Sequence, residues 1–177
     1  ELILSVAESC TGGLIAKYFT DFPGSSVFFD SGFVTYSNES KINYLHVSEE
    51  TLKENGAVSS EVVREMLNGL LKNSKIDVGI ATSGVAGPGG GTDSKPVGTV
   101  YIGWVFKEFD CYIEKYNFVG DRQLVREQAS NKAINGLFEY LNKIQIIKKW
   151  HYFFGSIGMD NDKKKALQSA LSQIEKQ

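Results

Sequence analysis

The sequence predicts an α/β fold, a three-layer α/β/α sandwich built on a mixed sheet. Short apolar runs alternate with segments of helical period along most of the chain, which places helices on both faces of the sheet. Two β-rich segments then follow one another as a hairpin, which adds antiparallel strands. With 177 residues, 42% of them hydrophobic, the chain is long enough for one sizeable core.

Each element is predicted by a local pattern. Strands are expected where apolar or β-branched runs are bounded by polar residues: Leu2–Ala7, Val27–Tyr36, Ile76–Thr82, Thr99–Phe106 and Cys111–Val119. Helices are expected where a capping side chain precedes apolar residues at helical spacing: from Thr11, from Ser37 or Asn38, from Ser48, from Ser59 and from Asp121.

Composition excludes several classes of function. The net charge is -2, without the basic footprint of a nucleic-acid-binding protein. No apolar run is long enough to cross a membrane. The two cysteines, Cys10 and Cys111, have no CxxC partner, and only two histidines are present, which is a poor inventory for a zinc site. The low cysteine content and the lack of a signal peptide predict a cytoplasmic protein.

The segment Glu8–Gly13, ESCTGG, joins the first predicted strand to the first helix. Such a turn lifts a side chain to the carboxyl end of the sheet, where open α/β folds bind ligands. Ser9 at this place could be a nucleophile, with the amides of the helix start stabilising negative charge. The alternative is that Ser9 and Thr11 only cap the helix and that the glycines only form the turn.

The segment Tyr36–Lys41, YSNESK, supplies a candidate base. A serine needs a base to be nucleophilic at neutral pH, and neither histidine is well placed. Lys41 can serve if burial and the helix dipole favour its uncharged form, and Tyr36 could relay a proton. The alternative is a solvated helix lysine. A short-chain dehydrogenase would need a dinucleotide-binding glycine motif, which is absent.

The segment Gly84–Gly98 follows a predicted buried strand and holds six glycines and two prolines. Glycines let a backbone approach a ligand closely and offer amides to phosphate oxygens. The loop is not a Walker A motif, because the GK[ST] ending is missing. A ligand-binding loop and a flexible surface loop are both compatible with this pattern.

Together these segments resemble the CinA C-terminal domain family, the nicotinamide-nucleotide amidases, over about residues 1–143. The matching stretches are AESCTGG (7–13), PGSS (23–26), GFVTYSNESK (32–41), ENGAVS (54–59), SGVAGPGGGTDSKPVGTV (83–100) and GDR (120–122). Several long motifs in the family's order are far more specific than any one of them.

The resemblance implies a hydrolysis without metal or cofactor, in which nicotinamide mononucleotide and water give nicotinic acid mononucleotide and ammonia. It implies that Ser9 is the nucleophile, that Lys41 is the base and that Tyr36 completes the set. The helix start after Thr11, with Gly12 and Gly13, would supply oxyanion donors. Further positions would line the nucleotide pocket or bind its phosphate: Ser26, Ser83, Gly84, Gly87 and Arg122.

The expected partner is therefore a small nucleotide, with no nucleic acid or membrane, and a homo-oligomer is left open. Two alternatives stay open beside the amidase. One is a non-catalytic nucleotide-binding or competence-related regulatory module, and the other is a general serine hydrolase of small amides.

The two ends of the chain depart from the family pattern. Family members carry a helix before the AESCTGG strand, and we expect this chain to lack it. We expect the amidase domain to end at residue 144 and to be followed by an irregular linker over 145–158. Residues 159–177, with KALQSALSQIEKQ, resemble the N-terminus of the RecA recombinase, which suggests a read-through between two coding regions. No RecA function is assigned, because its ATP-binding loop is absent.

Overall fold

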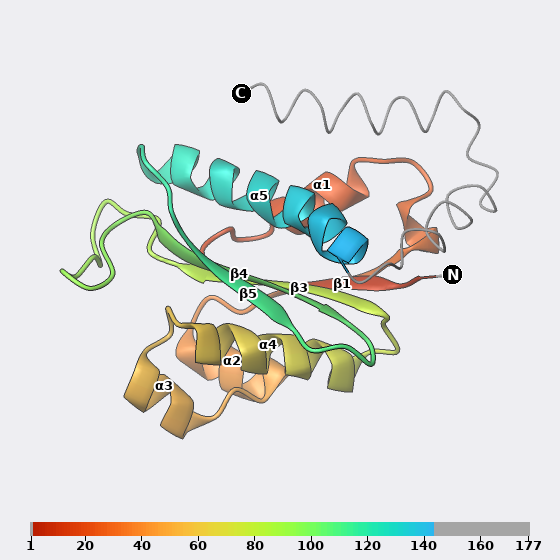
Figure 1. Cartoon of the computed structure of the whole chain (residues 1–177), viewed down its shortest axis with the longest axis horizontal. Helices are drawn as coiled ribbons and strands as arrows, with labels where there is room; N and C mark the ends of the chain where they lie inside the picture. Colours follow the sequence, from red (N-terminus) through yellow and green to blue (C-terminus); the bar gives the residue numbers. More distant parts are fainter. Residues whose placement is uncertain (1, 144–177) are drawn as a thin grey trace.

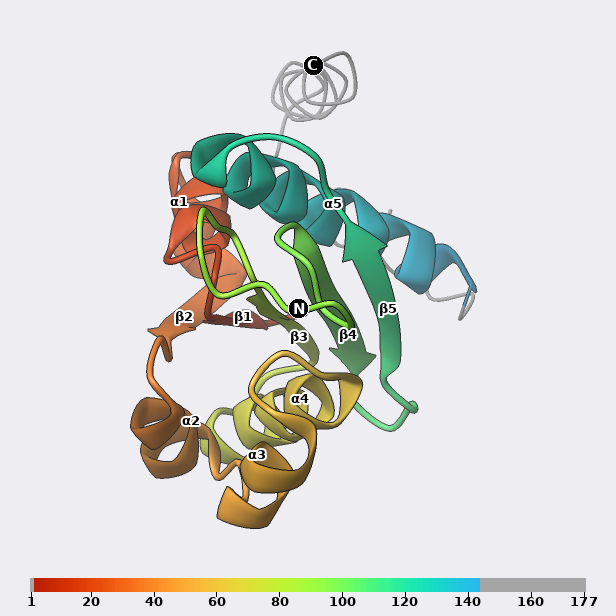
Figure 2. The same cartoon turned by 90° about the vertical axis from the view of Figure 1, so that its left-hand side faces the viewer.

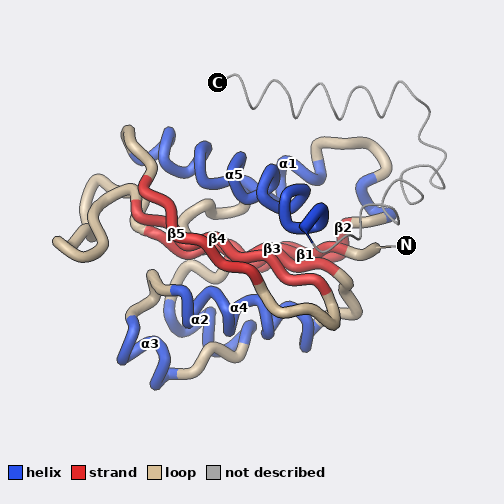
Figure 3. The backbone as a smooth tube through the Cα atoms, in the orientation of Figure 1, coloured by secondary structure: helices blue, strands red, loops and turns tan. Residues whose placement is uncertain are grey.

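A computed structural model of the chain describes residues 2–143 (Figure 1). The expected linker and the RecA-like segment lie outside these residues. Within them, a five-stranded sheet is covered by helices on both faces, as Figure 3 shows. The predicted α/β sandwich with a mixed sheet is confirmed.

The sheet has the strand order β2-β1-β3-β4-β5. β1 is parallel to its neighbours β2 and β3, whereas β4 is antiparallel to β3 and β5 is antiparallel to β4. The strands are β1 Leu4–Glu8, β2 Phe29–Val34, β3 Val78–Gly84, β4 Thr99–Phe106 and β5 Tyr112–Asn117. The three parallel strands therefore bring their carboxyl ends to the same edge of the sheet.

Two helices, α1 and α5, cover one face of the sheet, and α2, α3 and α4 cover the other (Figure 1). The helices are α1 Leu14–Thr20, α2 Asn38–Leu45, α3 Glu49–Asn55, α4 Ser60–Asn73 and α5 Arg122–Lys143. The predicted caps Ser37, Ser48 and Ser59 each accept a hydrogen bond from a backbone amide of the first turn. The predicted strand from Val27 is shorter than expected, because Ser25–Val27 form a 3-10 turn before β2.

Each face of the sheet has its own hydrophobic core. Val6 and Ile80 face α1 and α5, while their neighbours Ala7 and Ala81 face α4, as the alternation of a strand requires. Trp104 of β4 packs on α5, where its indole nitrogen donates a hydrogen bond to the carbonyl oxygen of Ala133 at 2.7 Å. The long helix α5 is thereby fixed over the sheet.

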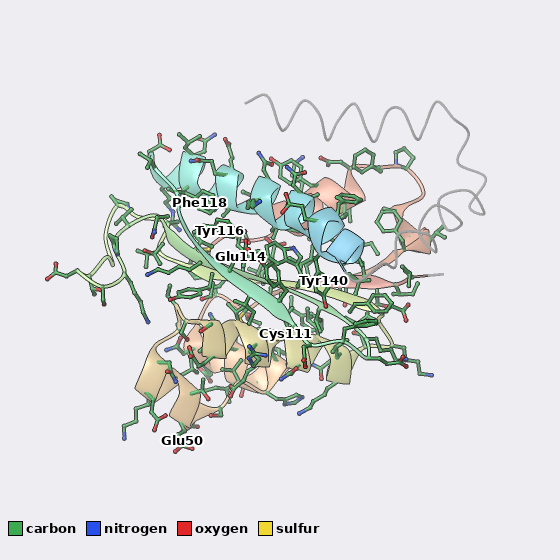
Figure 4. The ribbon with its side chains drawn as sticks, viewed as in Figure 1. Glu50, Cys111, Glu114, Tyr116, Phe118 and Tyr140 are labelled. Atoms are coloured by element: carbon green, nitrogen blue, oxygen red, sulfur yellow. The ribbon has the colours of Figure 1, made fainter. Side chains whose placement is uncertain are left out.

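Aromatic side chains continue this contact along β5. Tyr112 stacks on Tyr140 of α5, and Tyr116 stacks on Phe118. The hydroxyls of Tyr112 and Tyr116 both donate hydrogen bonds to Glu114, and Figure 4 labels Glu114 and Tyr116 on β5 with Phe118 just beyond its end. This packing fixes the far end of α5, while its first turns carry Arg122 and Arg126, which bind Gly87 and Cys10 at the carboxyl edge of the sheet.

Candidate active site

Ser9 lies directly after β1, at the carboxyl edge of the sheet, which faces the viewer in Figure 2. Its amide donates a hydrogen bond to the carbonyl oxygen of Thr82 in β3, at 3.0 Å. The chain leaves β1 toward β2 on one side and leaves β3 toward β4 on the other. This divergence creates the crevice in which open α/β sheets bind their ligands, so the fold places Ser9 where chemistry is expected.

The alternation of the β1 backbone sends two consecutive side chains to opposite faces. Glu8 turns toward α1, where its carboxylate accepts hydrogen bonds from the backbone. Ser9 turns toward α2, where Lys41 lies. Nucleophile and candidate base therefore meet because the serine is the residue that follows the last strand position.

Lys41 Nζ lies 3.1 Å from Ser9 Oγ and 2.7 Å from the carbonyl oxygen of Thr35. The carbonyl oxygen of Tyr36 is 3.4 Å away. Lys41 is only 1% exposed, and no ion pair joins it to a carboxylate within residues 2–141. Burial therefore disfavours the ammonium form and lowers the pKa of Lys41 to about 8. The structure brings together the two side chains that the sequence predicts to act together.

Local structure explains why Lys41 is buried. Ser37 caps α2 by accepting a hydrogen bond from the amide of Ser40 at 3.0 Å, which fixes the first turn of the helix. The amide of Thr35 donates to the carbonyl oxygen of Glu8 at 2.9 Å, so the end of β2 stays attached to the end of β1. These two constraints point the side chain of Lys41 back toward Ser9.

Tyr36 is brought to Arg122 rather than to Ser9. Its side chain is 59% exposed, and its hydroxyl accepts a hydrogen bond from Arg122 Nη2 at 2.6 Å. Arg122 Nη1 also donates to the carbonyl oxygen of Gly87 at 2.7 Å. Arg122 thus links the end of β2, the start of α5 and the glycine-rich loop across the site. A proton relay through the Tyr36 hydroxyl stays a prediction.

The start of α1 differs from the predicted arrangement. Thr11 does not cap the helix, because its buried hydroxyl bonds to the hydroxyl of Thr82 at 2.8 Å. Glu8 takes this role. Its carboxylate accepts hydrogen bonds from three backbone amides of the helix start, those of Gly13 at 2.9 Å, Ile15 at 3.2 Å and Ala16 at 2.8 Å.

The prediction that the helix start supplies oxyanion donors is therefore wrong for Gly13 and the residues after it. Their amides are bound to a buried carboxylate, which also neutralises the positive end of the helix dipole. The amide of Gly12 is bound as well, to the carbonyl oxygen of Ser9 at 3.2 Å. An acidic residue directly before a predicted strand-to-helix turn was the available signal for this cap.

The glycine-rich loop after β3 lies at the same edge of the sheet, between the two helical layers in Figure 2. The hydroxyl of Ser83 is committed to the carbonyl oxygen of Ala57, at 2.7 Å. Gly84 has no space for a side chain, since a Cβ would lie 2.7 Å from the carbonyl oxygen of Thr99. Gly87 needs glycine because its φ is 85°. The structure thus places Ser83, Gly84 and Gly87 beside the Ser9 crevice.

Ser26 lies at the other end of the sheet. It belongs to the 3-10 turn before β2, and Phe29 at the start of β2 pairs with Leu4 at the start of β1. Ser9 follows the opposite end of β1. Within one chain, Ser26 therefore does not line the crevice that holds Ser9, and the sequence-based assignment fails because parallel strands separate their two ends.

Sequence reasoning also missed a residue of α5. Arg126 donates hydrogen bonds to the carbonyl oxygens of Cys10 and Thr11, the two residues that follow the candidate nucleophile. With Arg122, it lines a cavity of about 390 Å³ whose other lining residues are Leu14, Gln123 and Glu127. In residues 2–143, no group of histidine, cysteine and acidic side chains could hold a metal ion. The helices in this range are too short or too polar to cross a membrane.

Comparison with known proteins decides the family. The CinA C-terminal domain matches residues 1–141. The chain belongs to this family. A nicotinamide-nucleotide amidohydrolase PncC from Enterobacter agglomerans is 54% identical over 127 residues, which cover 72% of this chain and 77% of that protein. A CinA-like protein from Akkermansia muciniphila is 47% identical over 143 residues, which cover 81% of this chain and 34% of that protein.

Several curated CinA relatives are thus about three times as long as the part that this chain matches.

Solved structures agree with the family assignment. The competence damage-inducible protein A from Klebsiella pneumoniae superposes with a TM-score of 0.77 at 40% identity, over 80% of this chain and 87% of that one. A competence/damage inducible protein from Agrobacterium tumefaciens gives 0.76 at 39% identity, over 78% and 84%.

Proposed function

We propose that the chain hydrolyses the carboxamide of nicotinamide mononucleotide to nicotinic acid mononucleotide and ammonia, with Ser9 as nucleophile and Lys41 as base. The observation that carries this proposal is the 3.1 Å contact between a serine hydroxyl and a buried lysine amine that has no carboxylate partner among the described residues. The name of the relative from Enterobacter agglomerans supports the substrate.

In the first half of the reaction, uncharged Lys41 accepts the proton of Ser9 as Ser9 Oγ attacks the carboxamide carbon. The carbon–oxygen bond forms, and the carbonyl oxygen becomes an oxyanion. When the oxyanion collapses, the carbon–nitrogen bond breaks, and a proton from Lys41, or from Tyr36, leaves with the nitrogen as ammonia. The acyl group of nicotinic acid mononucleotide remains on Ser9.

In the second half of the reaction, water takes the place of Ser9 as the attacking group. Lys41 accepts a proton from water, the hydroxide attacks the ester carbon, and Ser9 leaves with the proton that Lys41 returns. A pKa of about 8 allows Lys41 both to accept and to return a proton. The amine is partly uncharged at neutral pH, and the ammonium is still acidic enough to return the proton.

The substrate phosphate is assigned to the cavity beside the crevice. Arg122 lines this cavity and has a planar guanidinium that can pair with two phosphate oxygens. Its contacts with Tyr36 and Gly87 would place that phosphate next to the glycine-rich loop. This arrangement favours a nucleotide over a simple amide.

The chain is expected to release ammonia from nicotinamide mononucleotide at a kcat/KM at least about a hundredfold above that for nicotinamide riboside, because the riboside lacks the phosphate. The measurement is ammonia release together with chromatography of the acid product. Binding of the mononucleotide without ammonia release would instead support a regulatory nucleotide-binding module. Equal rates with nucleotide, riboside and free nicotinamide would support a general amide hydrolase.

A further inference from the structure

An oxyanion at the Ser9 site needs donors, and few backbone amides there are uncommitted. The amides of Gly12 and Leu14 bind the carbonyl oxygens of Ser9 and Thr11. Those of the following turn bind Glu8. The amides of Cys10 and Thr11 donate to no backbone carbonyl in residues 2–143, and the acceptor that they face is the thiol of Cys10 itself, a weak one. These two amides follow the nucleophile directly, and in α/β-hydrolases the residue after the nucleophile supplies an oxyanion donor.

Arg126 of α5 binds the carbonyl side of the Cys10–Thr11 peptide, whose N–H is the amide of Thr11, and the carbonyl of the peptide after it. Its Nε donates to the carbonyl oxygen of Cys10 at 3.1 Å, and its Nη2 donates to the carbonyl oxygen of Thr11 at 2.9 Å. The guanidinium fits closely against the backbone, since a Cβ at Gly12 would lie 3.1 Å from Nη2. Arg126 forms no ion pair with a carboxylate in the described part of the chain. Its charge is therefore directed at the two carbonyl groups.

The geometry of the peptide bond turns this contact into a constraint on the amide. In a trans peptide, the carbonyl and the following N–H point in opposite directions. A guanidinium on the carbonyl oxygen of Cys10 therefore fixes the amide of Thr11 pointing away from α5. Hydrogen bonds in a chain also polarise one another, so the charged donor strengthens that amide as a hydrogen-bond donor.

We infer that Arg126 is a positioning residue, which holds and polarises the Cys10–Thr11 peptide so that the amide of Thr11, next to that of Cys10, stabilises the oxyanion formed on attack by Ser9. The inference rests on the proposed function, because it needs a tetrahedral intermediate at Ser9. It separates the two arginines of the cavity by role: Arg122 serves the bound nucleotide, and Arg126 serves the transition state.

The two roles predict different kinetic defects. A residue that acts on the oxyanion lowers kcat and leaves KM nearly unchanged, whereas a residue that binds the substrate phosphate raises KM. We expect Arg126→Met to lower kcat about a hundredfold, comparable to the loss of one oxyanion donor, with KM within about threefold of the wild type. Arg126→Lys keeps the charge but cannot bridge two carbonyl oxygens, so a loss of about tenfold is expected.

The experiment is steady-state hydrolysis of nicotinamide mononucleotide by the full chain and these variants, with thermal unfolding measured in parallel. Arg64→Met is the matched control, because Arg64 is an exposed arginine of α4 that binds Cys111 on the opposite face. It should stay within about twofold of the wild type, as surface changes generally do. Added guanidinium ion should raise kcat of Arg126→Ala without raising that of the control.

An unchanged kcat in Arg126→Met, or a large rise in KM at constant kcat, would overturn the inference. Unfolding of both Arg126→Met and Arg126→Lys at the assay temperature would also overturn it, because a structural role would then suffice. Ser9→Ala in the same assay separates the two proposals. An active wild type with an inactive Ser9→Ala leaves the proposed function intact whatever Arg126 does, whereas an inactive wild type removes both.

Discussion

Ser9→Ala is expected to lower kcat for ammonia release by at least about a thousandfold, because removal of the nucleophile abolishes the acyl-enzyme route. Binding of nicotinamide mononucleotide should persist, since the hydroxyl contributes to the reaction rather than to nucleotide recognition. The fold should also persist, because the amide of Ser9, not its hydroxyl, attaches the residue to Thr82. The measurements are initial rates of ammonia release and calorimetric titration with the nucleotide.

Ser60→Ala serves as the matched control for this prediction. Ser60 begins α4, and its hydroxyl bonds only to the neighbouring Glu61 in the described structure. Its activity should equal that of the wild type. The serine mechanism would be contradicted if Ser9→Ala retained a tenth or more of the wild-type kcat, since water would then attack without a covalent intermediate.

Lys41→Met is expected to lower kcat by a similar factor, because no other base is found within hydrogen-bond distance of Ser9 Oγ in residues 2–141. The amine of Lys41 is the titratable side-chain group found within hydrogen-bond distance of Ser9 Oγ in residues 2–141. Lys53→Met is the control, an exposed lysine of α3 exchanged in the same way. Activity of Lys41→Met above about one per cent of the wild type would contradict the assigned role.

The same variant tests the burial of the charge. The pKa of Lys41 is lowered from 10.5 to about 8 in the folded chain. Below pH 8 the folded state carries the full cost of a buried ammonium, about 3 kcal/mol for a shift of this size. Between pH 8 and 10.5 the unfolded state binds more protons, so the stability of the wild type should rise relative to Lys41→Met. Urea unfolding of both proteins at pH 7 and pH 10 measures this difference.

Much of the site follows from local sequence. Ser9 lies in a strand-to-helix turn and Lys41 lies at the start of the helix after another such turn, and these turns converge on one edge of the sheet in an α/β fold. The caps Ser37, Ser48 and Ser59 were predictable because each acts on amides within three residues of its own position. Contacts between residues within one helical turn of each other can therefore be inferred from the sequence alone.

The residues that sequence reasoning missed depend on long-range packing. Arg126 reaches Cys10 across 116 positions of the chain, and the docking of α5 on the sheet and on α1 brings them together. Glu8, not Thr11, caps the helix. Strand alternation turns the Glu8 carboxylate toward the helix start, while the Thr11 hydroxyl binds the hydroxyl of Thr82. Ser26 was misplaced because the resemblance alone put it in the pocket, whereas it precedes β2 and Ser9 follows β1, so the parallel pairing of these strands puts the two at opposite ends.

The most direct test of the proposed chemistry is the pH dependence of kcat/KM for nicotinamide mononucleotide between pH 6.5 and 10. This range starts above the second ionisation of a phosphate ester, at about 6. An uncharged Lys41 as base predicts a rise of about tenfold per pH unit at low pH, with an inflection near the pKa of about 8 and a plateau above it. A profile that is flat from pH 6.5 to 10 would show that Ser9 does not give its proton to Lys41.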